Sequence, residues 1–295
     1  MPDEPTWPRP IWALVTIVVV AVLVMLQAKL VGSVFTTPLQ AGDDELPVAL
    51  EPLLRGPGPV AAAAVPDTVA VLQRSVIGEP QPSIGSTVTA GPGGADSSTQ
   101  SPATAVLLAG WATELGAVVG VPAVALAAYG AAQLEVAQSD PGCRLSWPTL
   151  AGIGWVESDH GRYAGAVLGA DGRSTPPIIG IPLDGRPGVA RIADSDGGRV
   201  DGDPVLDRAV GPLQFIPTTW ERWGVDADGD GVIDPFDIDD AALAAAQYLC
   251  EAGGDLSTGS GWTRSIYAYN ASDSYVLSVR GTADQYAAAS QQGAG

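Results

Sequence analysis

The first hydrophobic stretch of the chain lies near its N-terminus. Residues 11–26 form an apolar run broken only by Thr16, and a second apolar stretch follows at residues 30–35. Together they are long enough to cross a bilayer if the polar residues between them sit near the interface. A cleaved signal peptide is the alternative, but the run lacks a basic leader and a small-x-small site directly behind it. The pattern favours an uncleaved transmembrane signal anchor over residues 1–35.

Residues 36–102 have a different composition. They are rich in Pro, Gly, Ala, Ser and Thr and contain no aromatic residue. Such a segment cannot bury enough apolar surface to offset the entropy lost on ordering. We therefore predict a disordered linker here.

From residue 103 the apolar spacing becomes helical. Helices are predicted at 105–119, 122–138, from about Trp147, just after Thr218, at 239–250, and as two short helices within 261–286. The intervening residues 165–207 are rich in Gly, Pro and Asp, and their short apolar pieces IIGIP and VARIA suit small strands. The pattern predicts a set of helices within 103–290, with a small hairpin-rich insertion, and a frayed tail at 291–295.

One carboxylate lies on the apolar side of a predicted helix. Ser146 is a plausible N-cap and Pro148 is tolerated only in a first turn, so the helix begins near Trp147. Leu150 and Ile153 precede Glu157 by seven and four residues, which places all three on one face. Burial there would raise the pKa of Glu157, as a general acid requires. A solvated Glu or a structural ion pair is the alternative.

Composition excludes several classes of protein. The net charge is −19, with only fourteen scattered basic residues, so nucleic acid is not an expected partner. One histidine and two cysteines argue against His-rich zinc catalysis and a zinc finger. A Ser-His-Asp triad would have to use His160, and no motif supports it.

The sequence DADGDGVIDPFD follows the spacing of an EF-hand calcium loop. Counting from Asp226, side-chain or carbonyl ligands are expected at positions one, three, five, seven, nine and twelve: Asp226, Asp228, Asp230, Val232, Asp234 and Asp237. Position twelve carries the shorter Asp in place of Glu, which puts bidentate ligation in question. We predict a structural Ca²⁺ site, leading into the 239–250 helix. Five further aspartates, Asp194, Asp196, Asp201, Asp203 and Asp207, fit no known metal loop, and solvated turns are favoured for them.

Two further features concern ligand binding and stability. In GPLQFIPTTWERWG, Gln214 offers an amide and the aromatic residues offer flat faces, which together suit a sugar; core packing is the alternative for Trp220 and Trp223. Cys143 and Cys250 are the only cysteines, and in an extracytoplasmic domain we expect them to form a disulfide.

Four motifs stand in a definite order: Glu157-Ser158-x-x-Gly161, then Gly211-Pro212-Leu213-Gln214-Phe215-Ile216-Pro217, then the acidic loop with its helix, then Tyr269-Asn270-x-Ser272-x-x-Tyr275-Val276. In this order they resemble the lytic murein transglycosylases, in particular the membrane-bound lytic transglycosylase B-like branch of actinobacterial type. The resemblance covers roughly residues 103–286. Ala271 departs from relatives that often carry a larger polar residue there, which puts one substrate contact in doubt.

The resemblance implies a lysozyme-like, mainly helical α+β domain with a groove that binds peptidoglycan glycan strands. Members cleave between N-acetylmuramic acid and N-acetylglucosamine and leave 1,6-anhydromuramic ends. By motif match, Glu157 takes the place of the catalytic acid and base, and the groove residues are Ser158, Gln214, Phe215, Tyr269, Asn270 and Tyr275. The expected location is the cell membrane, with the catalytic domain on the cell-wall side. A muramidase of the same fold and a non-catalytic wall-binding module are the alternatives.

Overall fold

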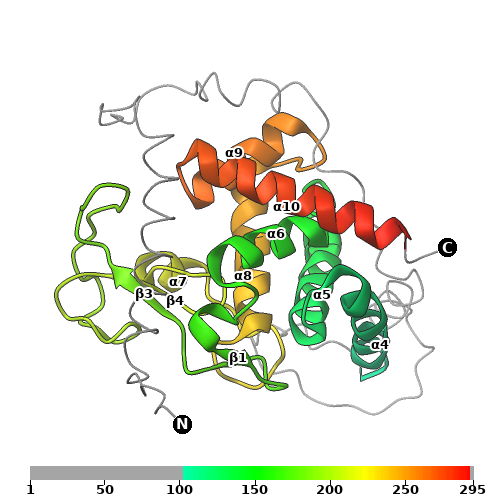
Figure 1. The fold of residues 1–295 in the computed structure, drawn as a ribbon, viewed down its shortest axis with the longest axis horizontal. Coiled ribbons are helices and arrows are strands. Elements are labelled where there is room, and N and C mark those ends of the chain that lie inside the picture. Colours follow the sequence, from blue (N-terminus) through cyan, green and yellow to red (C-terminus); the bar gives the residue numbers. More distant parts are fainter. Residues whose placement is uncertain (1–101, 293–295) are drawn as a thin grey trace, which may run out of the picture. The chain divides into compact units, whose positions relative to one another are not determined.

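The computed structural model describes residues 102–292 (Figure 1). The predicted anchor at 1–35, nearly all of the linker at 36–102 and residues 293–295 of the tail lie outside the described residues. The helices are α4 (Pro102–Val119), α5 (Ala123–Ser139), α6 (Trp147–Ser158), the short 3₁₀ helix η2 (Tyr163–Gly165), α7 (Pro217–Trp223), α8 (Ile238–Gly253), α9 (Gly259–Tyr269) and α10 (Asp273–Gln292). The strands are β1 (Val167–Leu168), β2 (Ser174–Thr175), β3 (Ile179–Pro182) and β4 (Arg208–Val210). The predicted mainly helical fold with small sheets is confirmed.

Helix α8 is the central element of the helical region (Figure 1). Its first turn is closed by Asp237, whose side chain accepts a hydrogen bond from the Asp239 N–H, as an N-cap does. Alanines along α8 are fully buried and allow α5 and α9 to approach closely. Helix α10 lies across α6, where a Cβ at Gly152 would come within 2.9 Å of the Val279 carbonyl oxygen. Small residues therefore set how tightly the helices around α6 and α8 pack.

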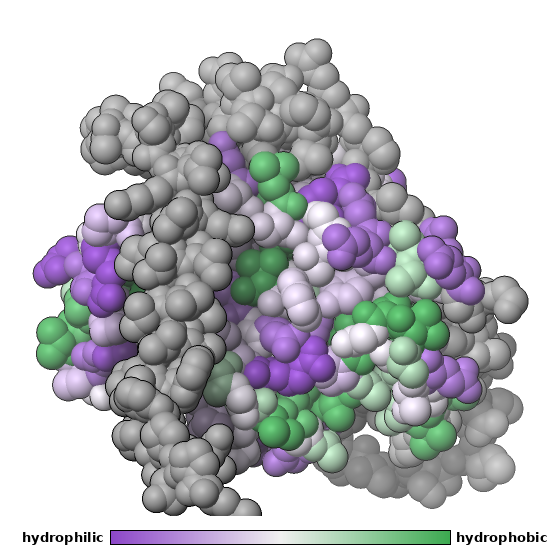
Figure 2. Space-filling view, viewed as in Figure 1, coloured by the Kyte–Doolittle hydropathy of each residue, from purple (hydrophilic) through white to green (hydrophobic). Residues whose placement is uncertain are grey.

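The 165–210 region contains two antiparallel two-stranded sheets, β1–β2 and β3–β4. The predicted strand in IIGIP is β3, whereas VARIA contributes only isolated bridges at Arg191 and Ala193. Figure 2 shows hydrophilic groups interspersed with hydrophobic ones at the left of the view, where Figure 1 places β3 and its loops. This region is a largely solvated appendage of the helical core.

The aspartates of this insertion are used in turns. Asp194 accepts hydrogen bonds from the N–H groups of residues 196, 197 and 198, and Asp207 accepts from both the N–H and the hydroxyl of Ser195. Asp203 accepts from Val205 and pairs with Arg208. These contacts stabilise local turns of the chain, as the turn interpretation expects.

The predicted helices are found, with one difference in length. The helix expected from Trp147 begins there, although the Ser146 side chain makes no capping hydrogen bond. The second of the two short helices predicted within 261–286 is instead the 20-residue α10, which continues to Gln292 because Ala287 and Ser290 remain on its buried face. Within residues 102–292 no single helix could span a membrane; the pair α4–α5 passes the same test by length and composition, with a bend of 118° between them.

Cys143 and Cys250 form a disulfide, as predicted. The bond joins the segment before α6 to the last turn of α8, across a sequence separation of 107 residues. The Leu256 N–H also donates to the Cys143 carbonyl, at 2.8 Å. The start of α6 is thus held to the end of α8 by a covalent bond and a hydrogen bond.

Candidate active site

Glu157 lies in the last turn of α6, on the face that carries Leu150 and Ile153. Both aliphatic side chains are fully buried, and Glu157 itself is only partly exposed. Its Oε1 accepts a hydrogen bond of 2.6 Å from the hydroxyl of Tyr275 on α10. Burial raises the pKa of Glu157 to about 7, and the Tyr275 hydrogen bond opposes part of that rise. Near neutral pH this carboxyl can both release and accept a proton.

The residue after Glu157 holds the end of α6 in place. The Ser158 hydroxyl donates to the Pro212 carbonyl at 2.6 Å and accepts from the Gly161 N–H at 2.7 Å. Ser158 is 1% exposed. We predicted Ser158 as a substrate contact; the structure instead places it between α6 and the Gly211-Pro212 turn, with its hydroxyl already engaged.

The Gly-Pro-Leu-Gln-Phe turn lies beside the end of α6. Gln214 adopts a left-handed φ of 52°, and its amide donates to the Gly211 carbonyl at 2.8 Å. Phe215 is buried, and its ring packs edge-on against Trp220 and Tyr269. Core packing therefore accounts for Phe215 and Trp220, while Gln214 remains partly exposed.

Tyr269, the last residue of α9, also belongs to this group of residues. Its hydroxyl donates to the Leu213 carbonyl at 2.7 Å. The charge of Glu157 contributes to raising the pKa of both Tyr269 and Tyr275, after burial, which shows that the three groups lie near one another. Asn270 follows as the exposed C-cap of α9. Three segments that are distant in sequence, namely the end of α6, the turn at 211–215 and the junction between α9 and α10, thus come together near the Glu157 carboxyl group.

His160 is not available as a catalytic base. It is fully buried, and its two ring nitrogens lie 3.1 Å from the Tyr129 hydroxyl and 2.8 Å from the Tyr286 hydroxyl. Burial lowers the pKa of His160 to about 3. Sequence patterns could not reveal this arrangement, because Tyr129 and Tyr286 are 31 and 126 residues away from His160.

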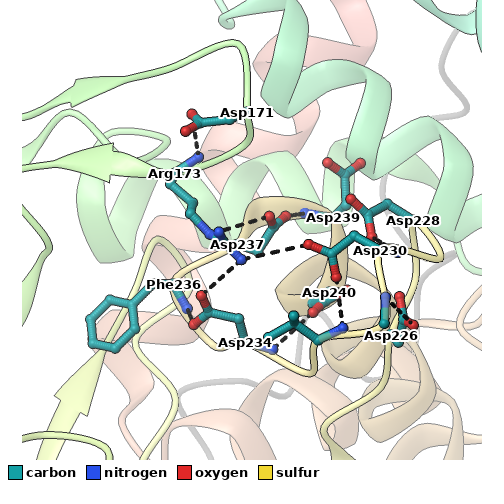
Figure 3. Close-up of polar contacts among 12 residues, drawn as sticks. Asp171, Arg173, Asp226, Asp228, Asp230, Asp234, Phe236, Asp237, Asp239 and Asp240 are labelled. Carbon is teal, nitrogen blue, oxygen red and sulfur yellow. Dashed lines mark hydrogen bonds and ion pairs between the residues drawn. The ribbon is translucent and has the colours of Figure 1, made fainter.

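The acidic loop between α7 and α8 divides into two groups of carboxylates (Figure 3). Arg173, from the β1–β2 hairpin, lies 3.0 Å from Asp234, 3.7 Å from Asp237 and 3.8 Å from Asp230. Because Asp237 also caps α8, the residue predicted at position twelve already has two partners. Three of the predicted ligands therefore face a guanidinium.

The second group offers the better fit to a cation. Carboxylate oxygens of Asp226, Asp228 and Asp240 lie within 4.8 Å of one another. Asp240 also accepts the N–H groups of Ala227 and Asp234, so it holds the two ends of the loop together. Hard oxygen donors at this spacing suit Ca²⁺. The loop pattern did not include Asp240, because this residue lies beyond the twelfth position, inside α8.

Comparison with known proteins adds three findings. Residues 208–265 match the family model described as "Transglycosylase SLT domain". This segment contains the Gly-Pro-Leu-Gln-Phe turn, the acidic loop and α8, and it excludes Glu157 and Tyr275. No curated protein matches the chain.

Similar solved structures include two of the Escherichia coli lytic transglycosylase Slt35. The complex with bulgecin A is 16% identical, covers 65% of this chain and 82% of its own, and has a TM-score of 0.39. The complex with calcium is 15% identical, covers 64% and 80%, and has a TM-score of 0.39. SltB3 from Pseudomonas aeruginosa in complex with NAG-anhNAM-pentapeptide is 16% identical, covers 83% and 72%, and has a TM-score of 0.36.

At these identities and TM-scores the structural likeness does not by itself establish a shared fold, so the assignment rests on the domain match. That match falls on the second and third of the four ordered motifs, including the turn that receives the Ser158 hydrogen bond. Residues 208–265 therefore match the transglycosylase SLT domain family, and this match supports the predicted lytic transglycosylase.

Proposed function

We propose that the protein cleaves the bond between N-acetylmuramic acid and N-acetylglucosamine in peptidoglycan and leaves 1,6-anhydromuramic ends, with Glu157 as the only catalytic carboxylate. The observation that carries this proposal is the half-buried Glu157, whose pKa is raised to about 7 and whose side chain, within residues 102–292, has the Tyr275 hydroxyl as its hydrogen-bond partner. An ordinary glycosidase uses two carboxylates. Within residues 102–292, no second carboxylate contributes to the pKa shift of Glu157.

The first step uses Glu157 as an acid. The protonated carboxyl transfers its proton to the glycosidic oxygen as the bond from that oxygen to C1 of the muramic acid breaks. The leaving N-acetylglucosamine departs with a free hydroxyl group, and positive charge develops at C1. Burial favours this step, because a Glu with its usual pKa would hold no proton at neutral pH.

The second step uses the same group as a base. The carboxylate accepts the proton of the muramic acid C6 hydroxyl while that oxygen bonds to C1, which closes the 1,6-anhydro ring. Glu157 is then protonated again and ready for the next cycle. No water is consumed, because the C6 hydroxyl of the sugar is the nucleophile. One carboxyl group whose pKa lies near the operating pH can therefore serve both steps.

Tyr275 fits the role of orienting the acid. Its hydroxyl occupies one carboxyl oxygen of Glu157, so the other oxygen is the one that can face the substrate. The hydrogen bond also favours the ionised form and keeps the pKa of Glu157 from rising further. We assign Gln214, Tyr269 and Asn270 to the walls of the glycan groove, because the charge of Glu157 acts on Tyr269, Asn270 follows Tyr269 at the surface, and Gln214 is partly exposed in the turn beside the end of α6.

The test compares Glu157→Gln with the wild-type full-length chain on purified peptidoglycan. Gln retains shape and can accept the Tyr275 hydrogen bond but cannot shuttle a proton, so cleavage should fall by several orders of magnitude with folding intact. Glu221→Gln, on the exposed side of α7, is the matched control and should cleave normally. Retention of a tenth of the wild-type rate by Glu157→Gln would move the catalytic role elsewhere.

Mass spectrometry of the wild-type products tests the chemistry of the second step. Anhydro ends are one water lighter than the reducing ends that hydrolysis leaves. Products with reducing ends alone would identify a muramidase that uses water in place of the C6 hydroxyl.

We further propose that the acidic loop holds a structural Ca²⁺, with Asp226, Asp228 and Asp240 as its carboxylate ligands. The clustering of these three carboxylates supports this choice. Of the six ligands that the loop pattern predicts, one of which is the Val232 carbonyl, three are instead paired with Arg173: Asp230, Asp234 and Asp237. The ion would offset the repulsion between the clustered carboxylates. It supplies no step of the glycan reaction.

Residues 1–35 are proposed to anchor the protein in the cell membrane, with residues 36–102 as a linker that lets the domain at 103–290 reach the wall. The apolar run at 11–26 supports this proposal. The full-length chain should stay with membranes during alkaline carbonate extraction, and protease added outside spheroplasts should cut it. Release by carbonate would contradict the anchor.

A further inference from the structure

A buried chain of three side chains joins the turn that follows α6 to two other helices. The His160 imidazole lies between the hydroxyl groups of Tyr129, on α5, and Tyr286, on α10. His160 and Tyr129 are completely buried and Tyr286 is 9% exposed. We call these three residues the Tyr-His-Tyr bridge. The catalytic steps proposed above make no use of it.

The chain adopts an unusual conformation to place His160 there. Asp159 and His160 both have left-handed φ values, 52° and 56°, which cost free energy for residues other than glycine. The reversal turns the His160 side chain back along α6, and the His160 N–H donates to the Gly154 carbonyl at 2.8 Å. The end of the helix that carries Glu157 is therefore bent so that the imidazole can reach both tyrosines.

The bridge fits without free space. A Cβ at Gly154 would collide with the Tyr129 hydroxyl and would lie 3.2 Å from His160 Nδ1, so the α6 backbone itself rests on the bridge. A neutral imidazole has one N–H donor and one acceptor nitrogen, so one tyrosine hydroxyl donates to it and the other accepts from it. Both nitrogens are thereby satisfied, and any displacement of α6 would leave a buried polar group unpaired.

Helix α10 connects the bridge to the catalytic carboxyl group. Tyr275 and Tyr286 are eleven residues apart, close to three full turns, so both lie on the same face of α10, about 16 Å apart along its axis. Tyr275 donates to Glu157 and Tyr286 bonds to His160. Between them, Val279 and Ala283 contact Gly152 of α6. One face of α10 therefore touches α6 at the bridge, at the packed glycine and at the catalytic carboxyl.

We propose that His160 is a positioning residue for the reaction: through Tyr129 and Tyr286 it fixes α6 against α10 and so holds Glu157 at the Tyr275 hydroxyl. This inference rests on the proposed role of Glu157 as acid and base. A shift of about 1 Å at a catalytic group can cost roughly a hundredfold in rate, so loss of one hydrogen bond of the bridge should be visible in kcat.

The test uses Tyr286→Phe in the full-length chain, because it removes one hydroxyl and keeps the ring that packs against Trp147. We expect kcat on soluble glycan strands to fall roughly tenfold, with KM changed less than about twofold. The matched control is Thr149→Val, which removes the buried hydrogen bond that α6 accepts from the Trp262 indole N–H. It should lower the melting temperature comparably and leave kcat and its pH profile unchanged.

A double-mutant cycle distinguishes positioning from general stability. If the bridge acts through the Tyr275–Glu157 hydrogen bond, Tyr286→Phe should change kcat less than about twofold in a Tyr275→Phe background. His160→Gln should behave like Tyr286→Phe in both backgrounds. If the two effects multiply, or if Tyr286→Phe loses no more activity than Thr149→Val, the positioning role is wrong.

The same experiment separates this inference from the proposed function. Inactive Glu157→Gln together with fully active Tyr286→Phe would overturn only the positioning role. Active Glu157→Gln would overturn the role of Glu157, and the positioning role with it. Should His160→Gln fail to fold, Tyr129→Phe, which removes the other hydroxyl, takes its place with the same expected results.

Discussion

Glu157 should destabilise the protein at the pH where it is ionised. Burial raises the pKa of Glu157 from 4.5 to about 7 in the folded state. Between these two values the folded protein binds a proton that the unfolded chain has lost, so the free energy of unfolding falls as the pH rises through this window. The cost is absent below about 4.5 and complete above about 7. Glu157→Gln removes it, because the amide does not ionise.

The size of the effect follows from the two pKa values. At about 1.4 kcal/mol per pKa unit, the difference corresponds to about 3 kcal/mol. The free energy of unfolding of Glu157→Gln, relative to wild type, should therefore rise by about 3 kcal/mol between pH 4 and pH 8. For a domain of this size that is roughly 10 °C in melting temperature. The inactive variant would be the more stable protein at alkaline pH.

Urea denaturation of both proteins at a series of pH values measures this difference. Calcium is kept in constant excess, so that titration of the acidic loop cancels between the two proteins. Glu221→Gln, at an exposed position on α7, serves as the matched control. A difference between Glu157→Gln and wild type that stays flat from pH 4 to pH 8 would show that the pKa of Glu157 is not raised, and the argument for a buried acid would fail.

Three further predictions concern the groups around this carboxyl. Tyr275→Phe removes the hydrogen bond that lowers the pKa of Glu157, so the alkaline limb of the pH–rate profile should move to higher pH; a shift to lower pH would contradict the assigned role of Tyr275. Millimolar calcium should raise the melting temperature and EDTA should lower it, because a hundredfold excess of the ion over Kd adds about 3 kcal/mol to the free energy of unfolding. Asp228→Ala should abolish the difference between the two conditions. A melting temperature that calcium does not change would contradict the proposed ion site. Replacing Cys143 and Cys250 with Ala should cost roughly 4 kcal/mol in urea denaturation, because the disulfide closes a loop of about a hundred residues; a cost below about 1 kcal/mol would show that the noncovalent contacts between α6 and α8 suffice.

The predictions that rest on local pattern agree with the structure. Helix α6 begins at Trp147 because Pro148 fits only a first turn, and the spacing of Leu150, Ile153 and Glu157 puts the carboxyl against the core. The same reasoning located α7 and α8. The disulfide could be predicted because Cys143 and Cys250 are the only two cysteines. Each of these inferences depends on residues a few positions apart.

The features that sequence reasoning missed all depend on contacts between distant segments. Arg173 meets the acidic loop only because the β1–β2 hairpin folds over it, so a twelve-residue pattern could not show that Asp230, Asp234 and Asp237 share a cation. Ser158 reads as a groove residue from its place beside Glu157, yet its hydroxyl faces Pro212. The partners of His160 come from two other helices. Such contacts become visible only when the packing is known.

The Gly211-Pro212 turn packs directly against the end of the acidic loop. Gly211 has a φ of 75°, and a Cβ there would overlap the carbonyl oxygen of Pro235, at the end of the loop. A side chain at position 211 would therefore clash with Pro235. A change in loop length that moved Pro235 toward the turn would clash with the turn in the same way. An insertion or deletion between Gly231 and Pro235 would displace the turn that receives the Ser158 hydroxyl, next to Glu157. Substitution of Asp226 or Asp228 should weaken ion binding without moving this turn, whereas a change in the number of loop residues should impair catalysis even in a variant that no longer binds an ion.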